Sequence, residues 1–190
     1  MLVYSSTAET AQLVQSAQMG SIEAFAMLVE RYEREIYRYL VGMLGDREEA
    51  QDLSQQVFLK AWINLPALQN AACFKSWLYS IARHLMCDHW RGKKPSSQSW
   101  EELLEDNAEP GLPGPEECIV EMELINMALL ELPLKLRQCL VLRFVEGFYP
   151  CEIACMVGIS VTSVSTYISM ARRQFRAIFE RLKDELENEE

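Results

Sequence analysis

Apolar residues recur at steps of three and four positions through most of this 190-residue chain. Such spacing lines apolar side chains along one side of an α-helix, whereas alternating apolar and polar residues would indicate a strand. No alternating strand pattern occurs in the sequence. The chain is therefore predicted to be all-α, built from amphipathic helices that each bury one side.

One segment, residues 92–118, interrupts the helical pattern. It holds four of the seven prolines and three of the eight glycines, and residues of these types at such density break regular structure. It also carries seven acidic and two basic residues, so half of the net charge of -10 lies there. We expect a flexible linker that joins two small helical domains, residues 1–91 and 119–190.

The first domain is expected to contain four helices. They are a short helix before Gly20 and three longer ones at residues 22–43, 48–64 and 74–91. Gly45 and Pro66 end the first two of the longer helices. The residues expected to face inward on the third are Trp77, Leu78, Ile81 and Leu85.

The second domain carries the pattern of a helix-turn-helix. Its predicted helices cover residues 119–130, 135–146 and 150–157, followed by a final helix through Leu182. Gly158 and Ile159 form the turn between the helix at residues 150–157 and the final helix, and Ser160 is a good N-cap for the final helix. A short helix, a turn with glycine and a longer helix match a helix-turn-helix. The residues expected to face inward on the second of these helices are Leu136, Leu140, Val141 and Phe144.

Several classes of protein are excluded. No run approaches 18 uncharged apolar residues, so no membrane-spanning helix is expected, and the start of the sequence lacks a basic region before an apolar run, so no secretory signal is expected. We therefore expect a cytoplasmic protein whose six cysteines are reduced, several of them at apolar helical positions where cysteine behaves as a small hydrophobe. The sequence has no C-x-x-C pair, phosphate loop or nucleophile elbow. No catalytic residue, cofactor, metal or small-molecule substrate is expected, since the one suggestive cluster (His84, Cys87, Asp88 and His89) has no second cluster to complete it.

Three surfaces are candidates for binding. The exposed start of the final helix carries small hydroxyl groups, which allow close approach to a DNA groove, and arginines suited to phosphate follow. These residues are Thr162, Ser163, Ser165, Thr166, Arg172, Arg173 and Arg176. A packed helical hairpin with a polar face is an equally good interpretation.

The other two candidate surfaces lie in the first domain. Lys75, Tyr79 and Arg83 follow one another at steps of four, with Arg91 near the same face, and can hold a single strand by phosphate contacts and stacking. On the preceding helix, Asp52, Gln55 and Gln56 lie beside the apolar Leu59 and Ile63, a combination typical of protein-docking faces. Ordinary solvated helix surface is the alternative in both cases.

Three motifs, taken in order, resemble bacterial RNA polymerase sigma factors of the extracytoplasmic-function (ECF) group of the sigma-70 family. Residues 46–62 (DREEAQDLSQQVFLKAW) are similar to the core-binding helix of that group, and residues 74–91 (FKSWLYSIARHLMCDHWR) to its promoter-melting helix. Residues 132–176 resemble its C-terminal helix-turn-helix. The resemblance covers about residues 20–91 and 119–180, and the order of the three motifs makes it specific.

The resemblance implies a non-enzymatic transcription initiation factor that binds core RNA polymerase and directs it to promoter DNA. The residues implied to bind the polymerase clamp are Asp52, Gln55 and Gln56. Those implied to lie near the melted minus-ten strand are Trp77, Arg83, His84 and Arg91, and residues 65–72 would receive a flipped base. Those implied to face the minus-thirty-five duplex are Thr162, Ser163, Ser165, Thr166, Tyr167 and Arg172. The family also implies an inhibitory anti-sigma factor, often membrane-anchored.

The chain departs from the family pattern at a few positions. The family usually has asparagine at His84 and glutamate at Gln56, and often basic residues at Ser165, Tyr167 and Met170. Fewer basic residues weaken phosphate anchoring by the final helix, which favours dependence on the polymerase. The alternatives are a stand-alone helix-turn-helix regulator and a metal- or redox-responsive interaction protein built on the cysteines.

Overall fold

The computed structural model describes residues 3–92 and 116–187, and every regular element in these ranges is a helix. The elements are α1 (Val3–Gln18), α2 (Ile22–Leu44), α3 (Arg47–Asn64), the 3-10 turns Leu65–Ala67 and Ala71–Cys73, α4 (Phe74–Gly92), α5 (Glu116–Glu131), α6 (Leu134–Phe144), α7 (Pro150–Val157) and α8 (Val161–Glu187). The all-α prediction is confirmed. Most of the predicted linker lies outside the described residues.

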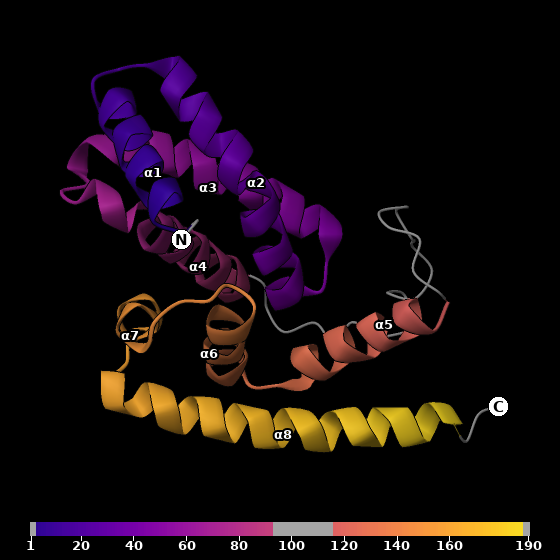
Figure 1. Ribbon diagram of the computed structural model, residues 1–190. Coiled ribbons are helices and arrows are strands. Elements are labelled where there is room, and N and C mark those ends of the chain that lie inside the picture. Colours follow the sequence, from indigo (N-terminus) through magenta and orange to yellow (C-terminus); the bar gives the residue numbers. More distant parts are fainter. Residues whose placement is uncertain (1–2, 93–115, 188–190) are drawn as a thin grey trace.

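Helices α1 to α4 pack together as the N-terminal region (Figure 1). Local chemistry sets where the helices begin and end. Ser21 caps α2 by accepting a hydrogen bond from the backbone N–H of Ala24, at 3.1 Å, and Asp46 caps α3 in the same way at Glu49, at 2.9 Å. Between these helices Gly45 has φ of 77°, in the left-handed region that glycine adopts without strain. This tight connection brings α3 back against α2.

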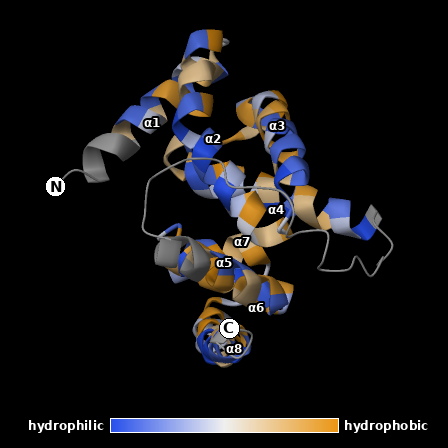
Figure 2. Cartoon of the chain, turned by 90° about the vertical axis from the view of Figure 1, so that its right-hand side faces the viewer, coloured by the Kyte–Doolittle hydropathy of each residue, from blue (hydrophilic) through white to orange (hydrophobic). Residues whose placement is uncertain are grey.

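Helices α5 to α8 form the C-terminal region. α8 runs the length of this region, with α5, α6 and α7 between it and the N-terminal helices (Figure 1). Figure 2, which looks along α8 from its C-terminal end, gives the same order of layers. α7 and α8 form the predicted helix-turn-helix, and Gly158, with φ of 70°, turns the chain between them. The Ser160 hydroxyl accepts the N–H of Ser163 at 3.2 Å, as expected of an N-cap.

The two regions pack directly against each other. One buried apolar cluster includes Met43 and Tyr79 of the N-terminal region together with Phe148, Ile153 and Val157 of the C-terminal region. α4 lies against α7, and the end of α2 lies against α5 and α6. The helical pattern of the sequence does not predict this contact, because it says only which side of each helix is apolar.

Some expected inward positions differ in the structure. Phe144 is 58% exposed, because it lies in the last turn of α6, where the chain leaves the bundle. Trp77 and Ile81 are half-buried rather than buried. Cys139 is buried, and burial raises the pKa of its thiol to about 11. Cys73, Cys151 and Cys155 are exposed, so the packing expected of Cys151 and Cys155 is wrong.

Membrane-spanning potential is low across the described helices. None of them alone is long and apolar enough to cross a bilayer. The pair Pro150–Val157 and Val161–Leu186 meets the length and composition criteria only when joined, and it is bent by 92°.

Candidate polymerase and nucleic-acid interfaces

The outer side of α3 presents a polar face to solvent. Leu53, Val57 and Ala61 are buried along the inner side of the helix. The outer side consists of the exposed residues Asp52, Gln55, Gln56 and Leu59, which we call the α3 polar face. Leu59 is 61% exposed. An apolar side chain held in solvent beside amides and a carboxylate is typical of a surface that a protein partner covers.

An apolar groove adjoins the α3 polar face. It has a volume of about 410 Å³ and is lined by Ile22, Phe25, Phe58, Leu59 and Trp62. The rings of Phe25 and Trp62, whose centroids lie 4.8 Å apart, join α2 to α3 at this point. Ile22 and Phe25 belong to the apolar stripe of α2, yet Ile22 is 69% exposed. Their place beside Leu59 depends on how α2 packs against α3, which the sequence does not reveal.

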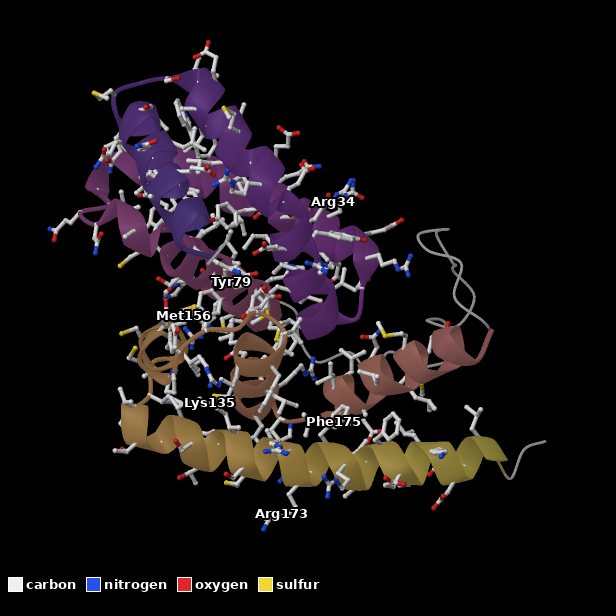
Figure 3. All side chains as sticks on the ribbon, in the orientation of Figure 1. Arg34, Tyr79, Lys135, Met156, Arg173 and Phe175 are labelled. Atoms are coloured by element: carbon white, nitrogen blue, oxygen red, sulfur yellow. The ribbon has the colours of Figure 1, made fainter. Side chains whose placement is uncertain are left out.

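The row of Lys75, Tyr79 and Arg83 on α4, which we call the α4 basic face, turns toward the C-terminal region. Tyr79 is fully buried, and Figure 3 shows it between the two regions. Its ring packs edge-on against Phe148, with the centroids 4.9 Å apart. Arg83 donates to the backbone carbonyl of Val157 at 3.2 Å. In this arrangement the row is therefore covered rather than open to solvent.

Charged groups surround the buried Tyr79. Its hydroxyl donates a hydrogen bond to the Glu146 carboxylate, and burial raises the pKa of Tyr79 above its ordinary value, so the hydroxyl keeps its proton. Burial also raises the pKa of the Glu146 carboxyl, although the hydrogen bond from Tyr79 and the charge of Lys75 oppose the change. The Lys75 ammonium pairs with Glu35 at 2.9 Å and lies 5.3 Å from the centre of the Phe148 ring.

The other residues predicted to contact the minus-ten strand lie apart from this row. Trp77 is half-buried against Phe74, with ring centroids 5.9 Å apart. His84 is exposed, and its ring Nδ1 lies 2.7 Å from the carbonyl of Ser80. Arg91 is exposed and pairs with Asp88 at 3.1 Å. Helical spacing explains the separation, because steps of seven residues line up Trp77, His84 and Arg91 on a second side of α4.

The loop between α3 and α4, residues 65–72, is held from α1. The Gln18 side-chain amide donates to the carbonyls of Leu65 and Leu68, at 3.0 and 2.7 Å. Asn70 caps the second 3-10 turn by accepting the N–H of Ala72 at 3.1 Å. Gln18 was not predicted as a site residue, and the only signal in the sequence is its polar character within the short first helix.

The suggestive His/Cys/Asp cluster is divided among separate contacts. His89 lies 2.9 Å from Glu49 of α3, whereas His84 contacts its own backbone. Within the part of the chain that the structure describes, no three His, Cys, Asp or Glu side chains gather as a metal site.

The helix-turn-helix exposes a polar row on α8. Thr162, Ser165, Thr166, Arg172, Arg173 and Arg176 are exposed, while Ser163 and Tyr167 are half-buried. Figure 3 shows Arg173 pointing away from all other helices. Val164 and Ala171 are buried on the opposite side of α8. A helix held firmly by one side and polar on the other can enter a DNA groove.

Comparison with known proteins gives the same division of the chain. The Sigma-70 region 2 model matches residues 28–95, and the Sigma-70 region 4 model matches residues 122–175. The ECF RNA polymerase sigma factor SigW of Bacillus subtilis is 32% identical over an alignment of 178 positions, and this alignment covers 86% of this chain and 92% of SigW.

Two solved structures share the fold. CnrH, in complex with the cytosolic domain of CnrY, has a TM-score of 0.71 and 22% identity, with 91% of this chain and 98% of CnrH covered. RpoE of Bartonella quintana, in complex with the anti-sigma factor NepR, has a TM-score of 0.69 and 18% identity, with 84% of this chain and 98% of RpoE covered.

Proposed function

Because the chain belongs to the sigma-70 family and is an ECF sigma factor, we propose that it binds core RNA polymerase through the α3 polar face and the adjoining apolar groove. Sigma factors are non-enzymatic, so we expect this surface to bind the polymerase and not to catalyse a reaction. The observation that carries the proposal is the exposure of Leu59 beside Gln55 and Gln56, where it lines a groove that no described part of the chain fills. Burying such a patch against a partner is favourable.

Promoter contacts are divided between the two regions in this proposal. The exposed row on α8 would face the minus-thirty-five duplex, with Arg172, Arg173 and Arg176 on its phosphates. α4 and the loop at residues 65–72 would hold the unpaired minus-ten strand, where binding of unstacked bases offsets the cost of opening. Gln18 supports this role because it fixes the backbone of that loop from outside it.

An anti-sigma factor is the proposed regulator. The structure of RpoE with NepR gives a precedent within the same fold. The apolar groove is suited to such a partner as well as to the polymerase, because both would bury the same aromatic and aliphatic side chains. Competition for one surface is a simple way to keep a sigma factor from the polymerase.

The test is the affinity of the purified chain for bacterial core RNA polymerase, measured by fluorescence titration without DNA. Gln55→Ala should weaken binding about tenfold, which corresponds to about 1.4 kcal/mol. Gln12→Ala, which removes the same side chain from an exposed site on α1, is the matched control. Unchanged affinity in a folded Gln55→Ala variant would move the polymerase site elsewhere on the chain.

A further inference from the structure

The loop at residues 65–72, which the proposed function assigns to an unstacked base, is largely open to solvent. Its exposed residues are Pro66, Ala67, Gln69, Asn70 and Ala72. Its regular structure consists of short 3-10 turns near its two ends. A loop that is already ordered binds more tightly than one that has to be ordered when its ligand arrives. The contacts that hold this loop therefore bear directly on how well it can take a base.

One side chain of α1 holds two points of the loop at once. The Nε2 atom of Gln18 donates to the carbonyl of Leu65 at 3.0 Å and to the carbonyl of Leu68 at 2.7 Å. Because both hydrogens belong to one planar amide, the spacing of the two carbonyls is fixed. The Leu65 carbonyl also accepts the backbone N–H of Leu68 at 3.1 Å, which closes a turn. Gln18 therefore sets the shape of the loop as well as its place against α1.

The far end of the loop is also supported from α1. α1 lies against both 3-10 turns. The hydroxyl groups of Thr10 on α1 and Tyr32 on α2 lie 3.3 Å apart in the core. The Tyr32 ring packs against Phe74, the first residue of α4, with the ring centroids 5.6 Å apart. Phe74 is fully buried, so the chain that leaves the loop is fixed where α4 begins.

α1 lies outside the part of the chain that the region 2 model matches. That match covers residues 28–95, whereas α1 ends at Gln18. Val14 and Ala17 bury the inner side of α1 in the same core as α2 and α4. Gln18 follows at the edge of this core and is half-buried. A hydrogen bond in such a place is stronger than one in open solvent, because the local dielectric constant is lower.

We propose that Gln18 is a positioning residue for base recognition, which holds the loop at residues 65–72 in the shape that accepts one unstacked base of the promoter. The inference rests on the proposed use of this loop for the minus-ten strand. In this role Gln18 acts through the carbonyls of Leu65 and Leu68 and touches no DNA. Without Gln18 the loop populates several shapes, and only a fraction of them accepts the base. Preference at one promoter position then depends on a helix outside the region 2 match.

The experiment measures base preference at each promoter position separately. Holoenzyme is assembled from the full chain and bacterial core RNA polymerase and mixed with DNA duplexes randomised across the minus-thirty-five and minus-ten regions. The complexes that survive a heparin challenge are sequenced. Gln18→Leu keeps the size of the side chain and removes its donor. If about one-tenth of its loops keep the competent shape, preference at one minus-ten position falls about tenfold, while the minus-thirty-five preferences stay unchanged.

Gln15→Leu is the matched control, because it makes the same change at an exposed site on α1 and should preserve every preference. Gln18→Asn keeps the amide but is one methylene shorter, so it should lose preference at the same position as Gln18→Leu. If Gln18 served stability alone, all minus-ten preferences would weaken together, and that result would overturn the proposal. Unchanged preferences in both Gln18 variants would overturn it as well.

A second measurement does not depend on how much of each variant is folded. Single strands of the selected minus-ten sequence, each with an abasic site at a different position, are bound to holoenzyme and compared with the intact strand by fluorescence anisotropy. Removing the base that the loop holds should weaken binding by wild type and by Gln15→Leu, and should have little effect with Gln18→Leu. Because each protein is compared with itself, a smaller folded fraction cancels. Equal losses in all three proteins at every position would contradict the role of Gln18.

The wild-type result distinguishes failure of this proposal from failure of the proposed function. If wild-type holoenzyme selects no sequence in the minus-ten region, the assignment of α4 and the loop to that strand is wrong. If wild type selects a sequence there and both Gln18 variants retain that selection in full, only the role of Gln18 is removed and the minus-ten site stays in place.

Discussion

The α3 polar face and the α4 basic face have the same origin in the sequence, as polar residues on the outer side of an amphipathic helix. In the structure, the two faces differ in how much of their surface is exposed to solvent. Gln55 and Gln56 of α3 are exposed, whereas Tyr79 of α4 is fully buried and Arg83 is half-buried. The difference arises because α7 and the connection between α6 and α7 pack against α4 and leave the polar side of α3 uncovered. A row of polar residues that points out of its own helical bundle can therefore still be covered by another region of the chain.

The two faces also differ in how their polar groups are satisfied. Water can hydrate the amides of the α3 polar face, so single substitutions there should change stability little. On the α4 basic face, partners from the other region replace water, and removing one partner leaves a buried group unsatisfied. Unfolding measurements can therefore test whether the two regions stay together in solution.

The largest effect is expected from Arg137→Ala. This change leaves the carbonyls of Met43, Leu130 and Leu132 without their donor, and we expect a loss of about 3 kcal/mol in the free energy of unfolding. Burial lowers the pKa of Arg137 to about 10, so the guanidinium is still charged at neutral pH. Urea titration followed by circular dichroism measures the loss.

Lys135→Ala is the control for Arg137→Ala, because Lys135 is an exposed cation on the same helix. Its effect should stay within about 0.5 kcal/mol. Equal stability of the two variants would mean that Arg137 is hydrated in solution and that the end of α2 does not rest on α6.

A smaller effect is expected from Tyr79→Phe. The change removes the donor to the Glu146 carboxylate while leaving the ring against Phe148, and it should cost about 2 kcal/mol. Tyr32→Phe makes the same change inside the N-terminal region, where Tyr32 meets Thr10 at 3.3 Å. Thr10 keeps its bond from Arg31, so this variant should lose about 0.5 kcal/mol. If Tyr79→Phe and Tyr32→Phe lost the same free energy of unfolding, Glu146 would be solvated and the two regions would be separated in solution.

Helix positions were predictable from the sequence, because spacing, prolines, glycines and caps act within a few residues. Pro150–Val157 and the Ser160 cap agree with expectation, and α3 begins one residue before its predicted start. The same local reasoning also located Leu59 on an exposed side. What the sequence could not supply was the contact between regions, since Glu146 and Phe148 sit in a connection with no periodic pattern of their own.

The candidate site residues also show that contacts between distant parts of the chain could not be predicted from local sequence patterns. Helical spacing separates the row of Tyr79 from the row of Trp77 on α4, although both rows were predicted to contact the minus-ten strand. The structure brings Tyr79 to Glu146, 67 positions away, and leaves His84 in solvent. Contacts at such separations depend on the packing of whole helices. The assignments to polymerase and DNA stay predictions that the experiments above test.

The smallest effect concerns pH and tests whether Glu146 is buried by the other region. Its pKa is raised in the folded chain, chiefly by burial and in part by Glu35, while Tyr79, Lys75 and Arg38 act in the opposite direction. The folded state then binds the Glu146 proton more tightly than the unfolded state does. The corresponding stability is complete below the ordinary carboxyl pKa and is lost as pH rises through the raised one.

Glu146→Gln isolates this contribution, because the amide is neutral at every pH and its oxygen still accepts the hydrogen bond of Tyr79. The free energy of unfolding of wild type and variant should be compared from pH 4 to pH 8, with a difference of about 1 kcal/mol or less arising from this one group. Relative to wild type, Glu146→Gln should become more stable as pH rises. A difference that is flat across this range would place Glu146 in water, and the α4 basic face would then be as open as the α3 polar face.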